Sequence, residues 1–363
     1  MIYLNPRGGL CNRLLVIEPV IQLGRKYRDS IIIFWRKCPE LECAFGDLFE
    51  DIIYDSWGGT LSVESICCPQ EELIKGIVER TGNKRIYMDT IGEIKRFQED
   101  YMNAEGVGEF LLSSDYRYDS GFPHDFSWLS PRKAIRDKVE QIARHFGDYC
   151  IGIHIRRTDH LVAKKLSGDQ LFVQVMNEEI ERNPDVKFFL ATDDIETKNF
   201  FMDKFGGRIV VNGNRTGGRQ SKEGMETAVI DLFALAKTQK IYGSFSSTFS
   251  SMASIIGNVK LESVCRNLPP ELKDKKIVLY GAGWLGQIVY AIYHKYCHIV
   301  GWIDQNDKEI SKAICREILN PEMIMGLDYD YIIIAVISDK SRAEIKQTLL
   351  GMGIGLDKII EDV

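Results

Sequence analysis

Long apolar runs, paired cysteine motifs and an excess of positive charge are all missing from this sequence. No segment of the 363 residues approaches the roughly 20 apolar residues that a membrane-spanning helix needs. No charged segment with a long apolar run precedes the first expected strand, "MIYLNP", which argues against a secretion signal. We therefore expect a cytoplasmic protein without a transmembrane segment, and leave open a loose membrane association through a partner or a lipid-linked acceptor.

The cysteines and the net charge exclude further classes. None of the nine cysteines forms a Cys-x-x-Cys pair, and Cys67 and Cys68 are adjacent, which suits neither a zinc site nor a disulfide framework. We expect reduced, mostly buried thiols and no metal site. The net charge of −6 argues against nucleic-acid binding, because no broad basic field would hold a polyanion. The oligomeric state stays open.

Short β-branched runs alternate with helical patterns along the chain, which predicts an α/β fold with parallel sheets. We expect an N-terminal α/β domain over residues 1–129 and a second Rossmann-like domain over 130–264, opened by a helix with Ser130 as N-cap and Pro131 next. The polar stretch 265–275 reads as a linker to a small Rossmann-like module over 276–363. Residues 58–130 show weak periodicity, and we expect irregular or helical insertions there.

"IGIHIRRTDH" (151–160) places a cluster of charged side chains at the end of an apolar strand. Alternation along the strand puts His154 and Arg156 on one face and Arg157 on the other. Ligands of open α/β sheets bind beyond the carboxyl ends of strands, and an arginine fork suits a diphosphate. Asp159 could orient a guanidinium; the alternative is a solvated Arg–Asp pair on the surface.

Two loops and one buried acid are further candidates. "NPRGGLCNR" (5–13) brings two glycines between a strand and a helix, which permits close backbone approach to a ligand or simply a tight turn. "YGSFSSTFSSMA" (242–253) places hydroxyls at a helix N-terminus, as in a phosphate or sugar site, although N-capping needs only one of them. Asp231 lies at the edge of a buried helix face, so its carboxylate needs a protein donor or the N–H groups of a ligand.

"GAGWLG" (281–286) follows an expected strand, and Asp304 ends the next strand. Gly281, Gly283, Gly286 and Asp304 have the spacing of a dinucleotide fingerprint, which makes NAD a candidate ligand of this module. The same glycines also serve close packing of a helix on a strand. The module offers no convincing catalytic acid–base set.

"GGLCNR", "HIRRTD", "LATDD" and "SFSSTFS" occur in this order over residues 1–262. Together they resemble the three-motif superfamily of α1,2-, α1,6- and protein O-fucosyltransferases. The resemblance implies a GT-B fold of two facing Rossmann-like domains, with the acceptor on the N-terminal side. It also implies inverting, metal-independent transfer of L-fucose from GDP-β-L-fucose to a glycan hydroxyl, with no cofactor required. A role in bacterial surface-polysaccharide synthesis is expected.

The resemblance also assigns roles to residues of this chain. Arg156 would hold the β-phosphate of GDP as a catalytic group, and His154 and Asp231 would contact the nucleoside end. By the same resemblance, Asn12 and Arg13 would line the cleft from the first domain, and Ser246, Ser247 and Thr248 would meet the diphosphate. Arg157, on the opposite strand face, is expected to serve as support or to contact the sugar. Gly9 and Asp193 complete the expected donor-binding set.

The general base departs from the family pattern. A glutamate shortly after the arginine motif of α1,6 members has no counterpart here, because "HLVAKKL" contains no carboxylate before Asp169. Asp159 and His160 are the nearest candidates for the base. Two alternatives to a transferase stay open. One is an NAD(P)-dependent oxidoreductase or epimerase using the C-terminal glycines, and the other is a non-catalytic regulator that binds a sugar nucleotide.

Overall fold

The chain forms two compact units. One consists of Met1–Arg156 with Val175–Ser263, and the other of Arg157–Gln174 with Val264–Val363. A computed structural model of the chain describes residues 1–52, 59–82, 85–88, 91–115, 122–158, 161–213, 220–266, 269–314 and 316–361.

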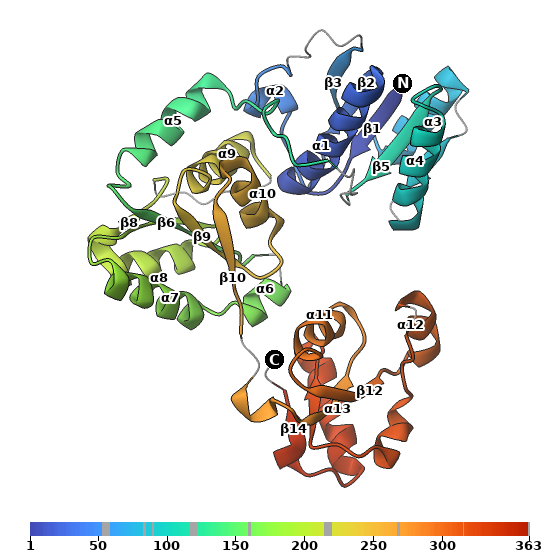
Figure 1. Cartoon of the computed structure of the whole chain (residues 1–363), viewed down its shortest axis with the longest axis vertical. Helices are drawn as coiled ribbons and strands as arrows, with labels where there is room; N and C mark the ends of the chain where they lie inside the picture. The colour runs from blue at the N-terminus through green and yellow to red at the C-terminus, as the bar shows by residue number, and fades with distance from the viewer. Residues whose placement is uncertain are drawn as a thin grey trace. The chain divides into compact units, whose positions relative to one another are not determined.

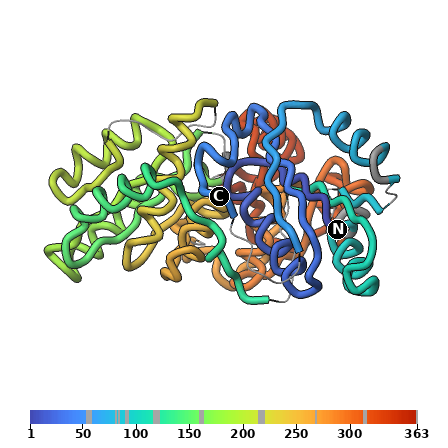
Figure 2. Tube along the Cα trace, turned by 90° about the horizontal axis from the view of Figure 1, so that it is seen from above, coloured from blue at the N-terminus to red at the C-terminus, as the bar shows by residue number. Residues whose placement is uncertain are grey.

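The first sheet has five parallel strands in the order β3-β2-β1-β5-β4. Its strands are β1 (Ile2–Pro6), β2 (Ile31–Arg36), β3 (Leu61–Ile66), β4 (Ile86–Met88) and β5 (Phe110–Ser114). Its helices are α1 (Leu10–Tyr27), α2 (Phe45–Leu48), α3 (Gln70–Thr81) and α4 (Ile91–Asn103). The blue trace of Figure 2 can be followed from the N-terminus through this part. Ile2 and Leu4 pack in the core with α1, and Tyr3 points to the other face with α3, as the two-residue period of a strand requires.

The expectation of irregular or helical insertions over residues 58–130 was right about helices, since α3 and α4 lie there, but it missed that the described part of that stretch also supplies three of the five strands. β3 is an edge strand whose side chains are half-buried or exposed, and β4 is only three residues long. Neither strand carries the continuous apolar run by which a central parallel strand is recognised.

The second sheet has the order β10-β9-β6-β7-β8. Its strands are β6 (Cys150–Ile155), β7 (Lys187–Thr192), β8 (Ile209–Val210), β9 (Lys240–Ser244) and β10 (Lys260–Val264). Its helices are α5 (Lys133–Ala143), α7 (Asp169–Arg182), α8 (Ile195–Phe205), α9 (Lys222–Leu235) and α10 (Thr248–Gly257), with a 3-10 turn, η1, at Gly206–Arg208. The short helix α6 (Leu161–Leu166) and the first turn of α7 belong to the second unit. Figure 1 shows α5, α9 and α10 on one side of this sheet and α7 and α8 on the other. The strands β6 to β9 pair in parallel.

Helix α5 begins later than the sequence predicts. Its N-cap is Arg132 rather than Ser130. Pro131 instead forms an antiparallel bridge with Phe49, which holds it extended, and the Ser130 hydroxyl accepts a hydrogen bond from Arg136. A tertiary backbone pairing therefore overrides the local capping signal.

The third sheet lies in the second unit and has four parallel strands in the order β12-β11-β13-β14. They are β11 (Lys276–Tyr280), β12 (His298–Ile303), β13 (Tyr331–Ile334) and β14 (Ile359–Ile360). The helices are α11 (Trp284–Tyr293), α12 (Asp307–Ile314) and α13 (Asp339–Gly351), with 3-10 turns η2 (Pro270–Leu272), η3 (Pro321–Gly326) and η4 (Leu356–Lys358). The core of this sheet includes Val278, Ile332 and Leu349.

The predicted fold class is confirmed. Two α/β sheets follow one another within the first unit, as expected for a GT-B arrangement, and a smaller parallel sheet follows them. Within the described ranges, no helix is both long and apolar enough to cross a bilayer. The described cysteines carry no disulfide, and the described acids, histidines and cysteines form no group that could hold a metal ion.

Candidate functional site

The candidate donor site lies where the strand order of the second sheet reverses. The chain runs from β6 to β7 and β8 on one side, then returns to place β9 on the other side of β6. In open α/β sheets, this switch point opens a crevice beyond the carboxyl ends of the two central strands. Arg156 follows β6 there, and Ser246, Ser247 and Thr248 follow β9. The topology thus brings two separate sequence motifs to one crevice.

Arg156 is held in place by two groups from neighbouring strands. Its Nη1 lies 2.9 Å from Oδ2 of Asp193, which follows β7, and the two side chains are only 17% and 11% exposed. Its backbone N–H donates to the Ser244 hydroxyl over 2.9 Å. A largely buried guanidinium with a fixed carboxylate partner is pre-oriented, so it can act on an anion without first losing conformational freedom.

His154 lies in the strand immediately before this cation. It is buried, and its ring stacks on Phe249 of α10 with the ring centroids 4.8 Å apart. This contact joins β6 to the helix that begins beyond β9.

The start of α10 has the properties of an anion site. Ser246 adopts a left-handed conformation with φ of +55°, which is uncommon for a residue with a Cβ atom. Ser247 is the N-cap residue, yet its side chain makes no capping hydrogen bond. The hydroxyls of Ser250 and Ser251 donate to the Ser247 carbonyl instead. The amides of the first turn are therefore not capped by Ser247, and Ser246 and Thr248 are exposed beside them.

Asp231 is buried and has a protein donor. Asn212 Nδ2 donates to Asp231 Oδ1 over 3.0 Å. Burial raises the pKa of Asp231 to about 7, although the Asn212 hydrogen bond and the positive charge of Lys198 oppose the shift. Lys198 is also buried, and its Nζ donates to the Gly213 carbonyl. One hydrogen bond does not exhaust the acceptor capacity of a carboxylate, so Asp231 can still accept from a ligand.

Arg157 makes contacts within the second unit. Its Nη2 donates to the Ser167 carbonyl and pairs with the Asp169 carboxylate, and its guanidinium lies 6.0 Å from the centroid of the Phe172 ring. The side chain is 9% exposed. These contacts connect the residues after β6 to the α6–α7 connection.

The glycine loop of the first unit is a tight strand-to-helix turn. Gly8 has φ of +74°, and Gly9 is the N-cap of α1. A Cβ atom at Gly8 would lie 3.2 Å from Asn12 Nδ2 and 3.4 Å from Asp115 Cβ. The loop therefore requires glycine for both its conformation and its close packing.

Arg13 holds this loop from inside. It is 1% exposed, and its guanidinium donates to the carbonyls of Gly8 and Arg36 and to Cys38 Sγ. Its carbon Cζ lies 5.1 Å from the centroid of the Trp35 ring. Arg13 thus ties the ends of β1 and β2 together with all its described contacts directed into the protein.

Asp159 and His160, the candidates for the base, lie outside the described residues. Sequence reasoning also missed several partners in the site: Ser244, Phe249, Asn212 and Lys198. For two of them the available signal was position, because Ser244 and Asn212 lie at or just after the carboxyl end of a strand.

The glycines of "GAGWLG" lie where β11 turns into α11, and this part of the second unit is closely packed and hydrogen-bonded. A Cβ atom at Gly286 would lie 1.8 Å from the Gly281 carbonyl oxygen, so α11 packs directly on the loop. Asp304 Oδ2 accepts from the Ala282 N–H over 2.7 Å, and Trp302 Nε1 donates to the Gly281 carbonyl. These contacts support the packing interpretation of "GAGWLG", and NAD binding there stays a prediction.

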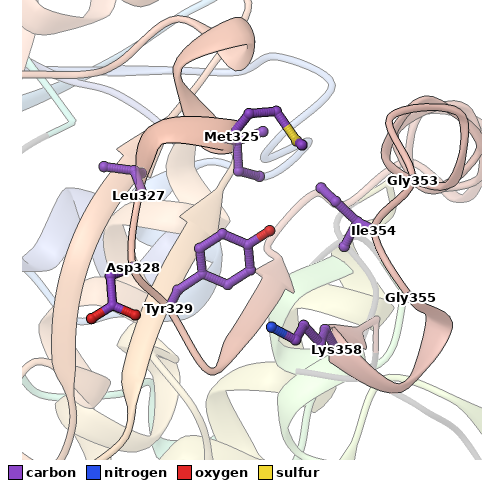
Figure 3. A pocket seen from close by; sticks show the side chains of 9 residues that line it. Met325, Leu327, Asp328, Tyr329, Gly353, Ile354, Gly355 and Lys358 are labelled. Carbon is purple, nitrogen blue, oxygen red and sulfur yellow. The ribbon is translucent and has the colours of Figure 1, made fainter.

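The second unit also has a pocket of about 300 Å³, apart from the "GAGWLG" loop. Figure 3 shows Tyr329 between Met325 and Lys358 in this pocket, and Lys358 Nζ lies 5.3 Å from the centroid of the Tyr329 ring. Its lining includes neither the glycines of "GAGWLG" nor Asp304. A larger pocket of about 570 Å³ in the first unit runs between α5 and the edge strand β8, and reaches the candidate site only at Asn212.

Residues 273–360 match the family model described as C2185-like, N-terminal. No curated protein matches the chain. Among solved structures, the chain is similar to fucosyltransferase NodZ from Bradyrhizobium (17% identity, 69% of this chain and 91% of that chain, TM-score 0.46). It is also similar to POFUT1 in complex with GDP (12%, 72% and 98%, 0.43) and to a mutant of Arabidopsis thaliana FUT1 in complex with GDP (14%, 74% and 70%, 0.49). At this level of similarity, the activity has to be argued from the residues of this chain.

Proposed function

We propose that this protein is an inverting, metal-independent glycosyltransferase. In this proposal, it moves L-fucose from GDP-β-L-fucose to a glycan hydroxyl in bacterial surface-polysaccharide synthesis. Residues 130–264 bind the donor and residues 1–129 bind the acceptor; the proposal assigns no role to the module over 276–363, which the linker 265–275 joins to them.

The observation that carries the proposal is the Arg156–Asp193 pair at the switch point of the second sheet. Inverting transfer passes through an oxocarbenium-like state, in which negative charge builds on the leaving diphosphate. A guanidinium already oriented by Asp193 stabilises that charge, and the uncapped amides of α10 add partial positive charge at the same crevice. These protein groups supply the charge stabilisation that a divalent cation provides in other transferases.

Asp231 supports the choice of a guanine nucleotide. Guanine presents a ring N–H and an exocyclic amino group on one edge, and a carboxylate accepts both. Asp231 has one described protein donor, Asn212, and further acceptor capacity. A uracil base has no amino group to offer to this carboxylate, so the residue favours GDP over UDP.

Calorimetric titration of the full chain with GDP, UDP and NAD tests the donor. We expect binding of GDP and a much weaker response to UDP; binding of UDP without GDP would overturn the donor assignment. GDP release from GDP-fucose then tests the reaction. A chain that binds GDP but shows neither transfer nor slow hydrolysis would be a sugar-nucleotide-binding regulator instead.

A further inference from the structure

A second polar cluster lies at the first sheet, outside all the motifs of the donor site. Asn5 Nδ2 donates to Ser113 Oγ over 3.0 Å, and Gln70 Nε2 donates to the same hydroxyl over 3.4 Å. Arg7 Nη1 donates in turn to Gln70 Oε1 over 3.1 Å. Asn5 and Ser113 are fully buried. Arg7 and Gln70 are half-buried and form the part of this cluster that a ligand can contact, and a guanidinium and an amide suit the hydroxyl groups of a sugar.

The topology places this cluster where a ligand is expected. The chain leaves β1 for β2 and β3 on one side and later returns to place β5 on the other side of β1. The carboxyl ends of β1 and β5 thus form the switch point of the first sheet. Asn5 and Arg7 belong to the end of β1, and Ser113 and Asp115 to the end of β5. The Arg7 N–H donates to the Ser114 carbonyl and keeps the two ends together.

Two oxygen atoms of this cluster are buried without a hydrogen bond. Asn5 Oδ1 and Asp115 Oδ1 are inaccessible, and neither has a partner among the residues that the structure describes. Leaving such an atom unsatisfied costs roughly 1–3 kcal/mol, so native proteins seldom do so without a reason. The Asp115 side chain as a whole is only half-buried, so a ligand hydroxyl would approach its other carboxylate oxygen.

Asp115 also lies against the glycine loop. Its Cβ is 3.4 Å from the position that a Cβ atom would take at Gly8, and Asn12 Nδ2 is 3.2 Å from the same position. Asp115 therefore lies beside the start of α1. Helix α1 packs against α10, the helix that begins at the candidate phosphate site, within the same unit.

We propose that this cluster binds the acceptor glycan and that Asp115 is the general base of the transfer. The inference rests on the proposed function. The acceptor oxygen forms a bond to C1 of fucose, the bond from C1 to the diphosphate oxygen breaks, and GDP leaves with the electron pair. The proton of the acceptor hydroxyl goes to the Asp115 carboxylate. Asn5 is fully buried and supports the cluster from inside, through its hydrogen bond to the Ser113 hydroxyl.

Hydrolysis of GDP-fucose tests the inference without knowledge of the acceptor, because water takes the place of the hydroxyl. We compare the unmodified chain with Asp115→Asn, which keeps the shape of the side chain, and with Glu64→Gln, which changes an exposed acid on β3 of the same sheet. Asp115→Asn should lower hydrolysis roughly 10²-fold, with GDP affinity and thermal unfolding unchanged. Formate should restore part of the rate of Asp115→Ala.

The outcomes separate the inference from the function on which it depends. A wild-type protein that neither binds GDP nor hydrolyses GDP-fucose would overturn the proposed function. A wild-type protein that hydrolyses GDP-fucose, with an Asp115→Asn rate less than tenfold lower or with no rescue of Asp115→Ala by formate, would overturn the base assignment alone. Glu64→Gln should keep the wild-type rate in either case.

Discussion

The Arg156 guanidinium and the Asp193 carboxylate form a 2.9 Å ion pair between the ends of two neighbouring strands, β6 and β7. Both side chains are largely withdrawn from solvent, so the pair is a fixed element of the site rather than a mobile surface contact. A guanidinium so held can stabilise charge on a diphosphate as that charge develops.

Arg156→Lys should lower the rate of fucose transfer or donor hydrolysis by roughly 10²–10³-fold, because an ammonium lacks the planar fork. GDP affinity, measured by calorimetry, should fall as well, while thermal unfolding stays close to that of the wild type. Arg144→Ala, at an exposed arginine in the same unit, is the control and should change neither property. A fully active Arg156→Lys protein would remove the phosphate role from this residue.

Arg157→Met should lower the free energy of unfolding by about 1–3 kcal/mol, because the Ser167 carbonyl and the Asp169 carboxylate lose a buried donor. Urea denaturation measures this effect. GDP titration of the folded variant then separates two interpretations of the residue. Affinity within about twofold of the wild type assigns Arg157 to holding the α6–α7 connection, whereas a large loss of affinity with unchanged stability supports the predicted donor contact.

Guanosine should bind more tightly as the pH rises from 6 to 8, by about tenfold, because Asp231 has to lose its proton to accept from the base. Burial raises the pKa of Asp231 to about 7, which places the change inside this range. Guanosine is the better probe, since it has no phosphate to titrate. Asp231→Asn should abolish the pH dependence, and a dependence that survives in this variant would assign it to another group.

Asp231 also makes the free energy of unfolding depend on pH. The folded chain holds a proton on Asp231 up to about pH 7, whereas an ordinary aspartate of pKa 3.8 has released it. The contribution of this group to stability is therefore present at low pH and is lost as the pH rises from about 4 toward 7. Asp231→Asn should remove this component from the pH dependence of urea denaturation. Stability that rises over this range through Asp231 would contradict the assignment.

Gly286→Ala should destabilise the second unit by about 2–4 kcal/mol, since a Cβ atom there would overlap the Gly281 carbonyl. Gly326→Ala is the matched control, because a Cβ atom at that position meets nothing within 4 Å. Hydrogen exchange of the amides in β11 and α11 should locate the loss, and GDP binding should persist. NAD binding by the unmodified full chain would show instead that the fingerprint serves a cofactor.

The alternation of apolar strands and helices in the sequence was enough to predict the fold class. Parallel strands that are covered on both faces need continuous apolar runs, and such runs can be recognised in the sequence. The sequence also predicted a ligand site at Arg156 and Ser247, and the family resemblance added Asp231; these assignments stay predictions. Edge strands such as β3 were not predicted, because many of their side chains face solvent and the sequence shows no continuous apolar run there.

Only the tertiary structure decided which groups meet. Strand order brought Asp193 to Arg156, Asn212 to Asp231, and Asn5 to the end of β5 beside Asp115. Strand order is set by how helices pack over the sheets, and no local pattern of residues records it. The sequence could therefore indicate which side chains are available for chemistry, while the partners of each depended on which strands became neighbours.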